Sequence, residues 1–399
     1  MTSTDTETLA TNSGDLDELL SALEYQVRIF GMSVGQKLSG SRLARLLNLL
    51  LISYMSVDFV FTIAVSSLIP TESDDLMLFP DIGHFVFNTG RHYVTIVVLC
   101  FKLNPLLLAI WFYFDRLKWY HRINNIYRAV VTVETHHRLM GVAKRCRLLS
   151  ILLMINIFLS IFSQHIYLLW KYADRNSRYP AIWYHHLYFL IFNIYGSVIN
   201  SWCFFKLYLF AKIGSELFVQ INRQFKEATR RRKRVDRYFF QYLKQYSLLC
   251  TMVNDLDYFL ARIYLILMIC YLPFIAQLFY NTFWAQIGMI YKIIYGFAGF
   301  WMAVLLLLFA KVIGEIDTKA KALSNRLYHQ LMIKDECRFA SENMEPVSGA
   351  GSMEQSFQYC ICPQVQQYFN STLNSFIGVR IFGNPINVNT IFTVGRDLY

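Results

Sequence analysis

Charged residues are scarce in this chain of 399 amino acids. Asp, Glu, Lys and Arg together make up 16% of it, against about 25% in an average soluble domain. Hydrophobic residues, counted with Tyr, make up 55%, and aromatic residues make up 17%. A soluble chain of this composition would expose large apolar patches to water. The composition therefore argues against a soluble enzyme, a disordered chain or a disulfide scaffold, and it indicates a membrane protein.

Signatures of the common enzyme classes are also missing. The sequence contains no Gly-rich phosphate-binding loop, no G-x-S-x-G motif and no H-E-x-x-H motif. Cys360 and Cys362 lack the companion ligands that a zinc site needs. We therefore expect no enzymatic activity, no cofactor and no bound metal ion.

Six stretches are long and apolar enough to cross a bilayer as helices, which takes about 20 residues each. A seventh, weaker segment begins near Ile377 and reaches Tyr399. The first residues, Met1–Asp17, are polar and acidic and do not resemble a signal peptide. The predicted fold is an all-α, polytopic membrane helix bundle with six full spans and an incomplete seventh. The six spans are Leu46–Ile69, Tyr93–Phe114, Leu148–Trp170, Trp183–Phe210, Phe259–Asn281 and Ile293–Ile313.

The distribution of Lys and Arg predicts the orientation of these spans, because cytoplasmic loops are enriched in both. Residues 1–45, 115–147 and 212–258 carry 22 of them, whereas residues 70–92, 171–182 and 282–292 carry five. The N-terminus is therefore expected in the cytoplasm. The net charge of +11 then indicates contact with anionic lipid and not with nucleic acid.

The predicted organisation has four parts. Residues 1–45 form a cytoplasmic N-terminal segment, and residues 46–313 form the six-span domain with cytoplasmic loops at 115–147 and 212–258. Residues 314–376 form a cytoplasmic loop and helix, and residues 377–399 begin the incomplete seventh span.

Amphipathic helical spacing in the cytoplasmic parts predicts helices at Asp236–Asp257, around residues 123–131 and at Val365–Phe376. We expect the first and last of these to pack together beneath the membrane.

Four charged residues fall inside the predicted spans. Lys206 and Arg262 lie near cytoplasmic ends, from which long side chains reach the headgroups. Asp58 and Lys102 each lie 12 residues from the inner end of their span, or roughly 18 Å at 1.5 Å per residue. Because charges at membrane depth pair with one another or line a wet cavity, the sequence predicts an intramembrane ion pair between these two residues. A role in ligand binding is the alternative.

Aromatic residues crowd the outer halves of the last four spans, with polar side chains between them. Helical bundles bind small molecules between helices in apolar pockets with a few polar anchors, although aromatic residues also belt ordinary membrane interfaces. We predict a ligand-binding cavity that opens to the outside. Its candidate residues are Tyr167, Trp183, Tyr188, Gln277 and Tyr295.

The N-in bundle, the long basic second cytoplasmic loop and the C-terminal motifs together resemble the insect gustatory receptor family. The motifs are Gln364–Leu373, then Phe382–Asn387, then Asn389–Gly395. They are similar to that family's last cytoplasmic helix and its entry into the seventh span. In the family a similarly placed glycine is soon followed by Thr-Tyr, five apolar residues and Gln-Phe. Here Gly395 is followed by Arg–Asp–Leu–Tyr399.

The resemblance implies a tetrameric ligand-gated cation channel at the plasma membrane of taste-neuron dendrites. It also implies small-molecule tastants as ligands, bitter compounds by default, and partners that are membrane lipids and other gustatory receptor subunits. The family's seventh span lines the pore, so the 399-residue chain alone is not expected to conduct. The alternatives are a secondary transporter, an odorant receptor of the same superfamily and a metabotropic seven-helix receptor. Internal pseudo-symmetry would favour the transporter, although no matching repeat surrounds Pro105 and Pro273.

Overall fold

The computed structural model describes residues 15–24, 42–68, 91–115, 120–173, 183–230, 235–285, 289–342, 380–381 and 384–385. Within these ranges the fold is helical apart from two short strands, so the all-α prediction is confirmed. The helices are α1 (Leu16–Glu24), α2 (Arg42–Leu68), α4 (Arg91–Asp115), α5 (Tyr120–Val130), α6 (Val133–Ala173), α7 (Trp183–Arg230), α8 (Val235–Phe283) and α9 (Met289–Glu342).

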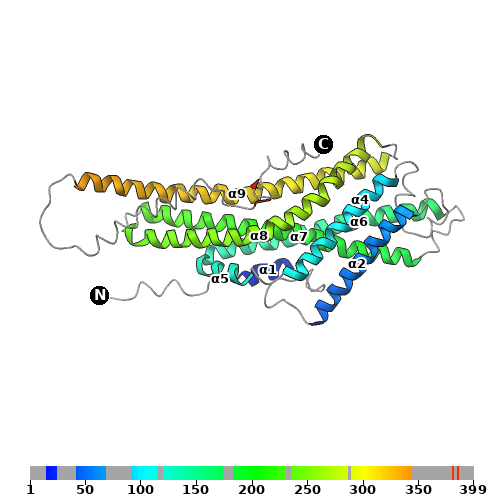
Figure 1. Ribbon diagram of the computed structural model, residues 1–399, viewed down its shortest axis with the longest axis horizontal. Coiled ribbons are helices and arrows are strands. Elements are labelled where there is room, and N and C mark those ends of the chain that lie inside the picture. The colour runs from blue at the N-terminus through cyan, green and yellow to red at the C-terminus, as the bar shows by residue number, and fades with distance from the viewer. Residues whose placement is uncertain are drawn as a thin grey trace.

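Each predicted span falls inside one of these helices, except for Ile69, which lies outside the described residues. The sequence predicted that residues 212–258 and 314–342 form loops and helices separate from the spans. This prediction is wrong for the described residues, which continue α7, α8 and α9. The three helices lie side by side along the long axis of the molecule (Figure 1). They are continuous because no proline interrupts the passage from the apolar to the amphipathic part of any of the three helices.

Helix α7 occupies the centre of the bundle, in contact with α4, α6, α8, α9 and α1. Its residues from Tyr195 to Ala211 are buried on all sides except at Tyr208. Phe204 stacks on Phe309 of α9 at 5.1 Å between ring centroids and lies 5.4 Å from Tyr271 of α8. A helix that is apolar all round is typical of the interior of a large bundle or of a membrane.

The predicted amphipathic face of Asp236–Asp257 is buried, as its spacing indicated. Phe239, Tyr246, Leu249, Val253 and Leu256 are all at most 5% exposed.

Helix α7 covers part of this face. Phe218 of α7 packs edge-on against Tyr246, and Phe225 of α7 packs edge-on against Tyr242. The helix that we expected to pack there, Val365–Phe376, lies outside the described residues.

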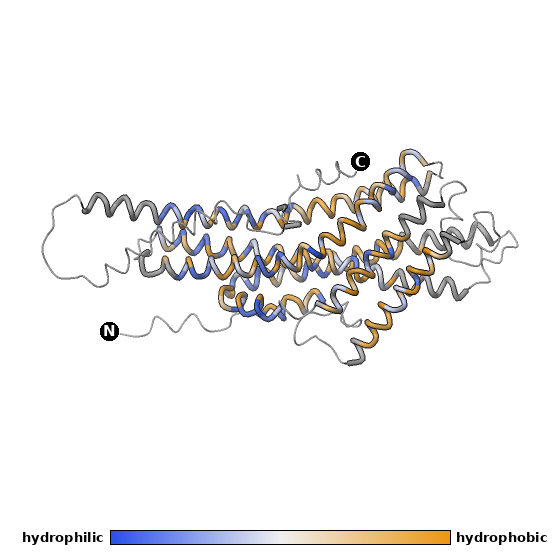
Figure 2. Tube along the Cα trace, in the orientation of Figure 1, coloured by the Kyte–Doolittle hydropathy of each residue, from blue (hydrophilic) through white to orange (hydrophobic). Residues whose placement is uncertain are grey.

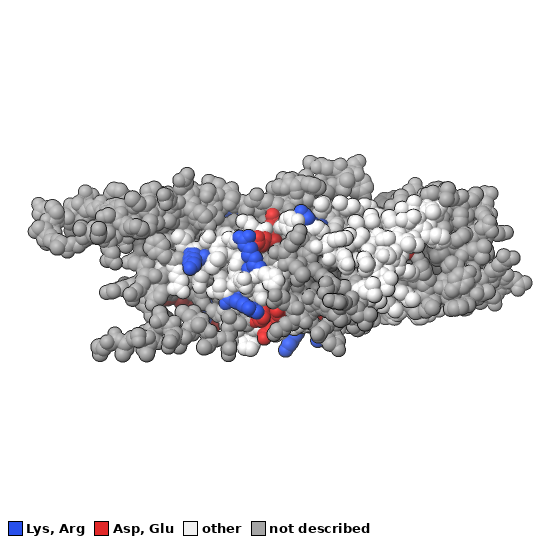
Figure 3. Space-filling model, turned by 60° about the horizontal axis from the view of Figure 1, so that its bottom comes forward, with Lys and Arg blue, Asp and Glu red and all other residues white. Residues whose placement is uncertain are grey.

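Large exposed hydrophobic side chains divide the molecule into two halves. All of them except Val133 lie in the predicted spans or within five residues of a span. For example, Val57 is 68% exposed, Leu152 is 53% exposed and Phe297 is 61% exposed. The described parts of residues 196–257 and 309–330 expose none. Figure 2 shows the same division as a mostly hydrophobic half and a half of mixed hydropathy. We call the first the apolar-surfaced half and the second the polar-surfaced half. On the face in Figure 3, charged side chains gather near the middle, and the described surface to the right is almost uncharged.

An exposed apolar surface of this kind is typical of a protein that contacts lipid or another protein. By length and composition, three helices of the described chain are able to cross a membrane: Leu46–Ala64, Gln241–Phe283 and Lys292–Gln330. Leu99–Trp111 is a shorter apolar stretch. The described chain is therefore compatible with a membrane protein.

The strands β1 (Arg380–Ile381) and β2 (Asn384–Pro385) pair antiparallel, with Arg380 opposite Pro385, and β1 contacts α8. The sequence predicted that the seventh span begins near Ile377. This start is wrong, because extended backbone occupies 380–381 and 384–385. Gly383 and Pro385 both disfavour a helix at this place. The remaining residues of the 377–399 segment lie outside the described chain.

Two glycines of α9 allow it to approach α8 closely. A Cβ atom on Gly299 would lie 3.3 Å from Cβ of Leu278, and one on Gly296 would lie 3.0 Å from Cγ2 of Thr282. Small residues at such contacts are the usual device of helix packing in membranes.

Gly299→Val is expected to destabilise the protein by about 1–3 kcal/mol, because the added methyls overpack a contact close to the backbone of α8. The measurement is the midpoint of thermal unfolding in detergent. Gly141→Val is the matched control, since a Cβ on Gly141 meets nothing within 4 Å. Equal midpoints for the two variants would show that the α8–α9 contact does not need a glycine.

Candidate functional site

The two charged residues predicted to meet inside the bundle are in contact. Lys102 Nζ on α4 lies 2.7 Å from Asp58 Oδ2 and 2.9 Å from Asp58 Oδ1 on α2. It also donates a hydrogen bond of 2.7 Å to Thr62 Oγ1, one helical turn beyond Asp58. The side chain of Asp58 is 1% exposed and that of Lys102 is 11% exposed. The pair thus neutralises two largely buried charges, each of which would be costly to bury alone.

A second polar group joins α4 to the centre of the bundle. Asn104 Nδ2 donates to Asn200 Oδ1 of α7 at 2.6 Å and to the hydroxyl of Tyr271 on α8 at 3.1 Å. Lys102 and Asn104 are two residues apart, so they project from different sides of α4. Helix α4 therefore contacts α2 through the ion pair and contacts α7 and α8 through the amide.

The ion pair and the amide group together form what we call the polar layer: Asp58, Thr62, Lys102, Asn104, Asn200 and Tyr271. Asn104, Asn200 and Tyr271 lie 10 to 12 residues from the predicted inner ends of their spans, which is roughly 15–18 Å at 1.5 Å per residue. This is the depth expected for the ion pair.

Both α4 and α8 contain a proline beside the polar layer, Pro105 next to Asn104 and Pro273 two residues after Tyr271. A proline inside a helix removes one backbone hydrogen bond and allows a bend. Among the described residues, Asn104 Oδ1 and Asn200 Nδ2 have no hydrogen-bond partner although both side chains are buried. Buried amide groups without partners are costly, so the hydrogen-bonding groups of this junction are only partly satisfied.

The five residues predicted to bind a ligand come from four helices. Gln277 is partly buried on α8 and donates to Asn281 Oδ1 at 3.1 Å. Tyr295 lies partly buried on α9. Tyr167 lies on α6, and Trp183 and Tyr188 lie on α7, but their side chains are outside what the structure describes. The existence of the predicted outer cavity therefore stays a prediction.

The N-terminal helix α1 is a feature that the sequence reading missed. Asp15 begins it as an N-cap, because its carboxylate accepts a hydrogen bond of 3.1 Å from the backbone of Asp17. Four leucines recur with helical spacing on one face and are fully buried against the bundle: Leu16, Leu19, Leu20 and Leu23. This spacing was the available signal, hidden in an otherwise polar segment.

Polar contacts fix α1 to α5 and α6. The carboxylate of Asp15 pairs with Arg128 at 2.5 Å, and Glu18 contacts His136 at 3.1 Å. The hydroxyl of Tyr120 donates to Asp17. Burial, followed by the hydrogen bond and charge of Asp17, raises the pKa of Tyr120. The phenol consequently stays protonated and remains a donor across the physiological pH range.

Lys206 corrects another prediction, because it does not extend towards the headgroups. Its ammonium group lies 2.5 Å from Glu24 Oε1 at the end of α1 and 4.1 Å from the ring centroid of Trp202. The side chains of Lys206 and Glu24 are 1% and 0% exposed. The N-terminal helix therefore supplies the charge that allows a lysine at the centre of α7.

Within the described residues, no group of three or more His, Cys, Asp and Glu side chains is placed to hold a metal ion. The polar layer offers one charged pair, three amide or hydroxyl side chains and a threonine, enclosed by aromatic and aliphatic groups. Comparison with protein-family models and with curated proteins finds no match to the chain.

Proposed function

We propose that this chain is a plasma-membrane chemoreceptor similar to the insect gustatory receptors, acting as a subunit of a tetrameric ligand-gated cation channel. Its ligands in this proposal are small-molecule tastants, bitter compounds by default, and its partners are further receptor subunits of the same or a related kind. The proposal places six spans in the bilayer and an incomplete seventh after the β1–β2 pair, with the N-terminus and the polar-surfaced half in the cytoplasm.

The observation that carries the proposal is the polar layer beside Pro105 and Pro273. A receptor must have two arrangements of its helices with different affinities for the ligand. The layer links α2, α7 and α8 at one depth through α4. Buried amide atoms without partners leave the described arrangement less than fully satisfied. These features support a bistable junction below the predicted outer cavity.

The direct test is a ligand screen on cells that express the chain, alone and together with candidate partner subunits. Ligand-dependent cation current that disappears without the chain would support the proposal. Saturable uptake of a solute without such current would replace it with the secondary transporter. Ligand-dependent current that requires the chain in olfactory neurons, but is absent from taste neurons, would favour the odorant receptor.

Alanine substitution of Tyr167, Trp183, Tyr188, Gln277 and Tyr295 tests the outer cavity. Loss of a buried aromatic contact or of an amide hydrogen bond costs about 1–3 kcal/mol of binding, so at least one variant is expected to raise the half-maximal ligand concentration about tenfold. The measurement is a dose–response curve at matched surface expression. Thr251→Ala on α8, in the polar-surfaced half, serves as a control. Unchanged curves for all five variants would eliminate this cavity.

A further inference from the structure

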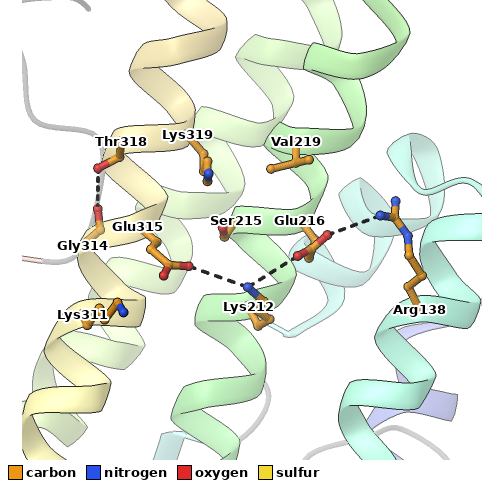
Figure 4. A pocket seen from close by; sticks show the side chains of 10 residues that line it. All are labelled: Arg138, Lys212, Ser215, Glu216, Val219, Lys311, Gly314, Glu315, Thr318 and Lys319. Atoms are coloured by element: carbon orange, nitrogen blue, oxygen red, sulfur yellow. Dashed lines mark hydrogen bonds and ion pairs between the residues drawn. The ribbon is translucent and has the colours of Figure 1, made fainter.

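A polar cavity of about 610 Å³ lies between α6, α7 and α9, in the half of the molecule with a hydrophilic surface (Figure 4). It is separate from the polar layer and from the predicted outer cavity. Its lining residues are Arg138, Lys212, Ser215, Glu216, Val219, Lys311, Gly314, Glu315, Thr318 and Lys319.

The cavity adjoins the inner edge of the predicted spans. Lys212 follows Phe210, where the fourth span ends, and Lys311 precedes Ile313, where the sixth span ends. Exposed leucines of the apolar-surfaced half begin nearby in sequence, Leu148 on α6 and Leu308 on α9. In the orientation given under the proposed function, on which this position rests, the cavity lies at the level of the cytoplasmic headgroups.

The charges that line the cavity are predominantly basic, with four Lys or Arg side chains against two Glu. Lys212 forms ion pairs with both carboxylates, since its Nζ lies 3.5 Å from Glu216 Oε1 and 3.7 Å from Glu315 Oε2. Arg138 also approaches Glu216, at 3.9 Å. The two glutamates are therefore already neutralised from within the protein.

Lys311 and Lys319 remain as cations available to a ligand. Neither has an acidic partner within 4.0 Å among the described residues, and both are exposed. They lie eight residues apart on α9, so they project from similar sides of that helix. Two ammonium groups with free donors at one wall of a cavity are suited to phosphate oxygens, which form strong charge-assisted hydrogen bonds.

We propose that this cavity binds a phosphorylated anionic group, with Lys311 and Lys319 as its direct ligands. The group is the headgroup of a phosphorylated lipid of the inner leaflet or a soluble polyphosphate of the same chemistry. The cavity volume falls within the range of small-molecule sites, and clustered basic side chains at the cytoplasmic face of membrane helices are the usual receptors of such headgroups.

The test measures binding to the purified full-length chain in nanodiscs of neutral phosphatidylcholine. The probes are a short-chain phosphatidylinositol bisphosphate and inositol trisphosphate, each titrated by microscale thermophoresis. Lys311→Gln/Lys319→Gln is expected to weaken binding about tenfold or more. Lys226→Gln/Lys244→Gln removes the same charge from exposed positions outside the cavity lining, and it is expected to change binding less than twofold.

Preference for the lipid probe would assign the site to a headgroup, and equal affinity for both probes would assign it to a soluble phosphate. Absence of saturable binding, or equal weakening by the two double variants, would overturn the proposal. Thermal unfolding of each variant establishes that the fold is retained. Because no current is recorded, failure of this experiment leaves the proposed receptor function untouched.

Discussion

Replacing either Glu24 or Lys206 alone is expected to destabilise the protein more than any other single change considered. Each replacement leaves one charge at the centre of the bundle, where side-chain exposure is 0% and 1%. Breaking a buried ion pair in this way costs about 3–5 kcal/mol. Glu24→Leu and Lys206→Met should therefore both lower the unfolding midpoint strongly and reduce the amount of protein at the cell surface.

The double variant Glu24→Leu/Lys206→Met distinguishes an ion pair from simple packing. Replacing both charges by apolar groups of similar size is often neutral or stabilising, so the double variant is expected to recover most of the loss. Glu227→Gln is the control, because its pair with Arg223 is exposed on both sides and such pairs contribute only about 0–1 kcal/mol. A double variant as unstable as the sum of the single variants would contradict this account of α1.

Asp58→Ala and Lys102→Ala are expected to have the second largest effects, and for a different reason. A lone charge near the middle of a bilayer costs about 2.5–3.5 kcal/mol on insertion scales, so each single variant should reduce surface expression measured by biotinylation. Asp58→Ala/Lys102→Ala should recover part of it. Thr62→Val retains the pair but removes one acceptor from Lys102, so we expect an intermediate loss. Equal surface levels for all four variants would show that the ion pair is not needed.

The sequence was sufficient for features that depend on local pattern. Runs of apolar residues located helices that the structure contains, and the buried face of Asp236–Asp257 followed from helical spacing alone. The contact of Asp58 with Lys102 was predictable because two opposite charges stood at equal depth in consecutive antiparallel spans.

Features that depend on distant parts of the chain could not be predicted. The partner of Lys206 is a glutamate 182 residues earlier, in a segment whose polar composition concealed the short helix α1. The continuity of α7, α8 and α9 across the predicted membrane boundary was missed because a change in hydropathy resembles a change of element. The cavity at Lys311 and Lys319 requires three helices to be placed together, and no local pattern in α9 indicates it.

The polar layer could not be predicted for the same reason. Asn104, Asn200 and Tyr271 each resemble an ordinary residue of an apolar span, and they acquire a shared role only when α4, α7 and α8 meet. Their equal depth is visible in retrospect from the span boundaries. Their contact depends on the rotation of each helix, which periodicity within one span does not determine.

In the proposed receptor, the apolar-surfaced half lies in a bilayer, with the N-terminus and the polar-surfaced half in the cytoplasm. Mapping with introduced glycosylation acceptors tests this arrangement most directly, because only segments that reach the lumen are modified. Acceptor sites inserted in residues 70–92 and in residues 171–182 are predicted to be glycosylated, as judged by a shift that endoglycosidase removes. Acceptor sites inserted before residue 15 and in residues 231–234 are predicted to stay unmodified. Glycosylation at either of the last two positions, or at none of the four in a chain that reaches the membrane, would contradict the account.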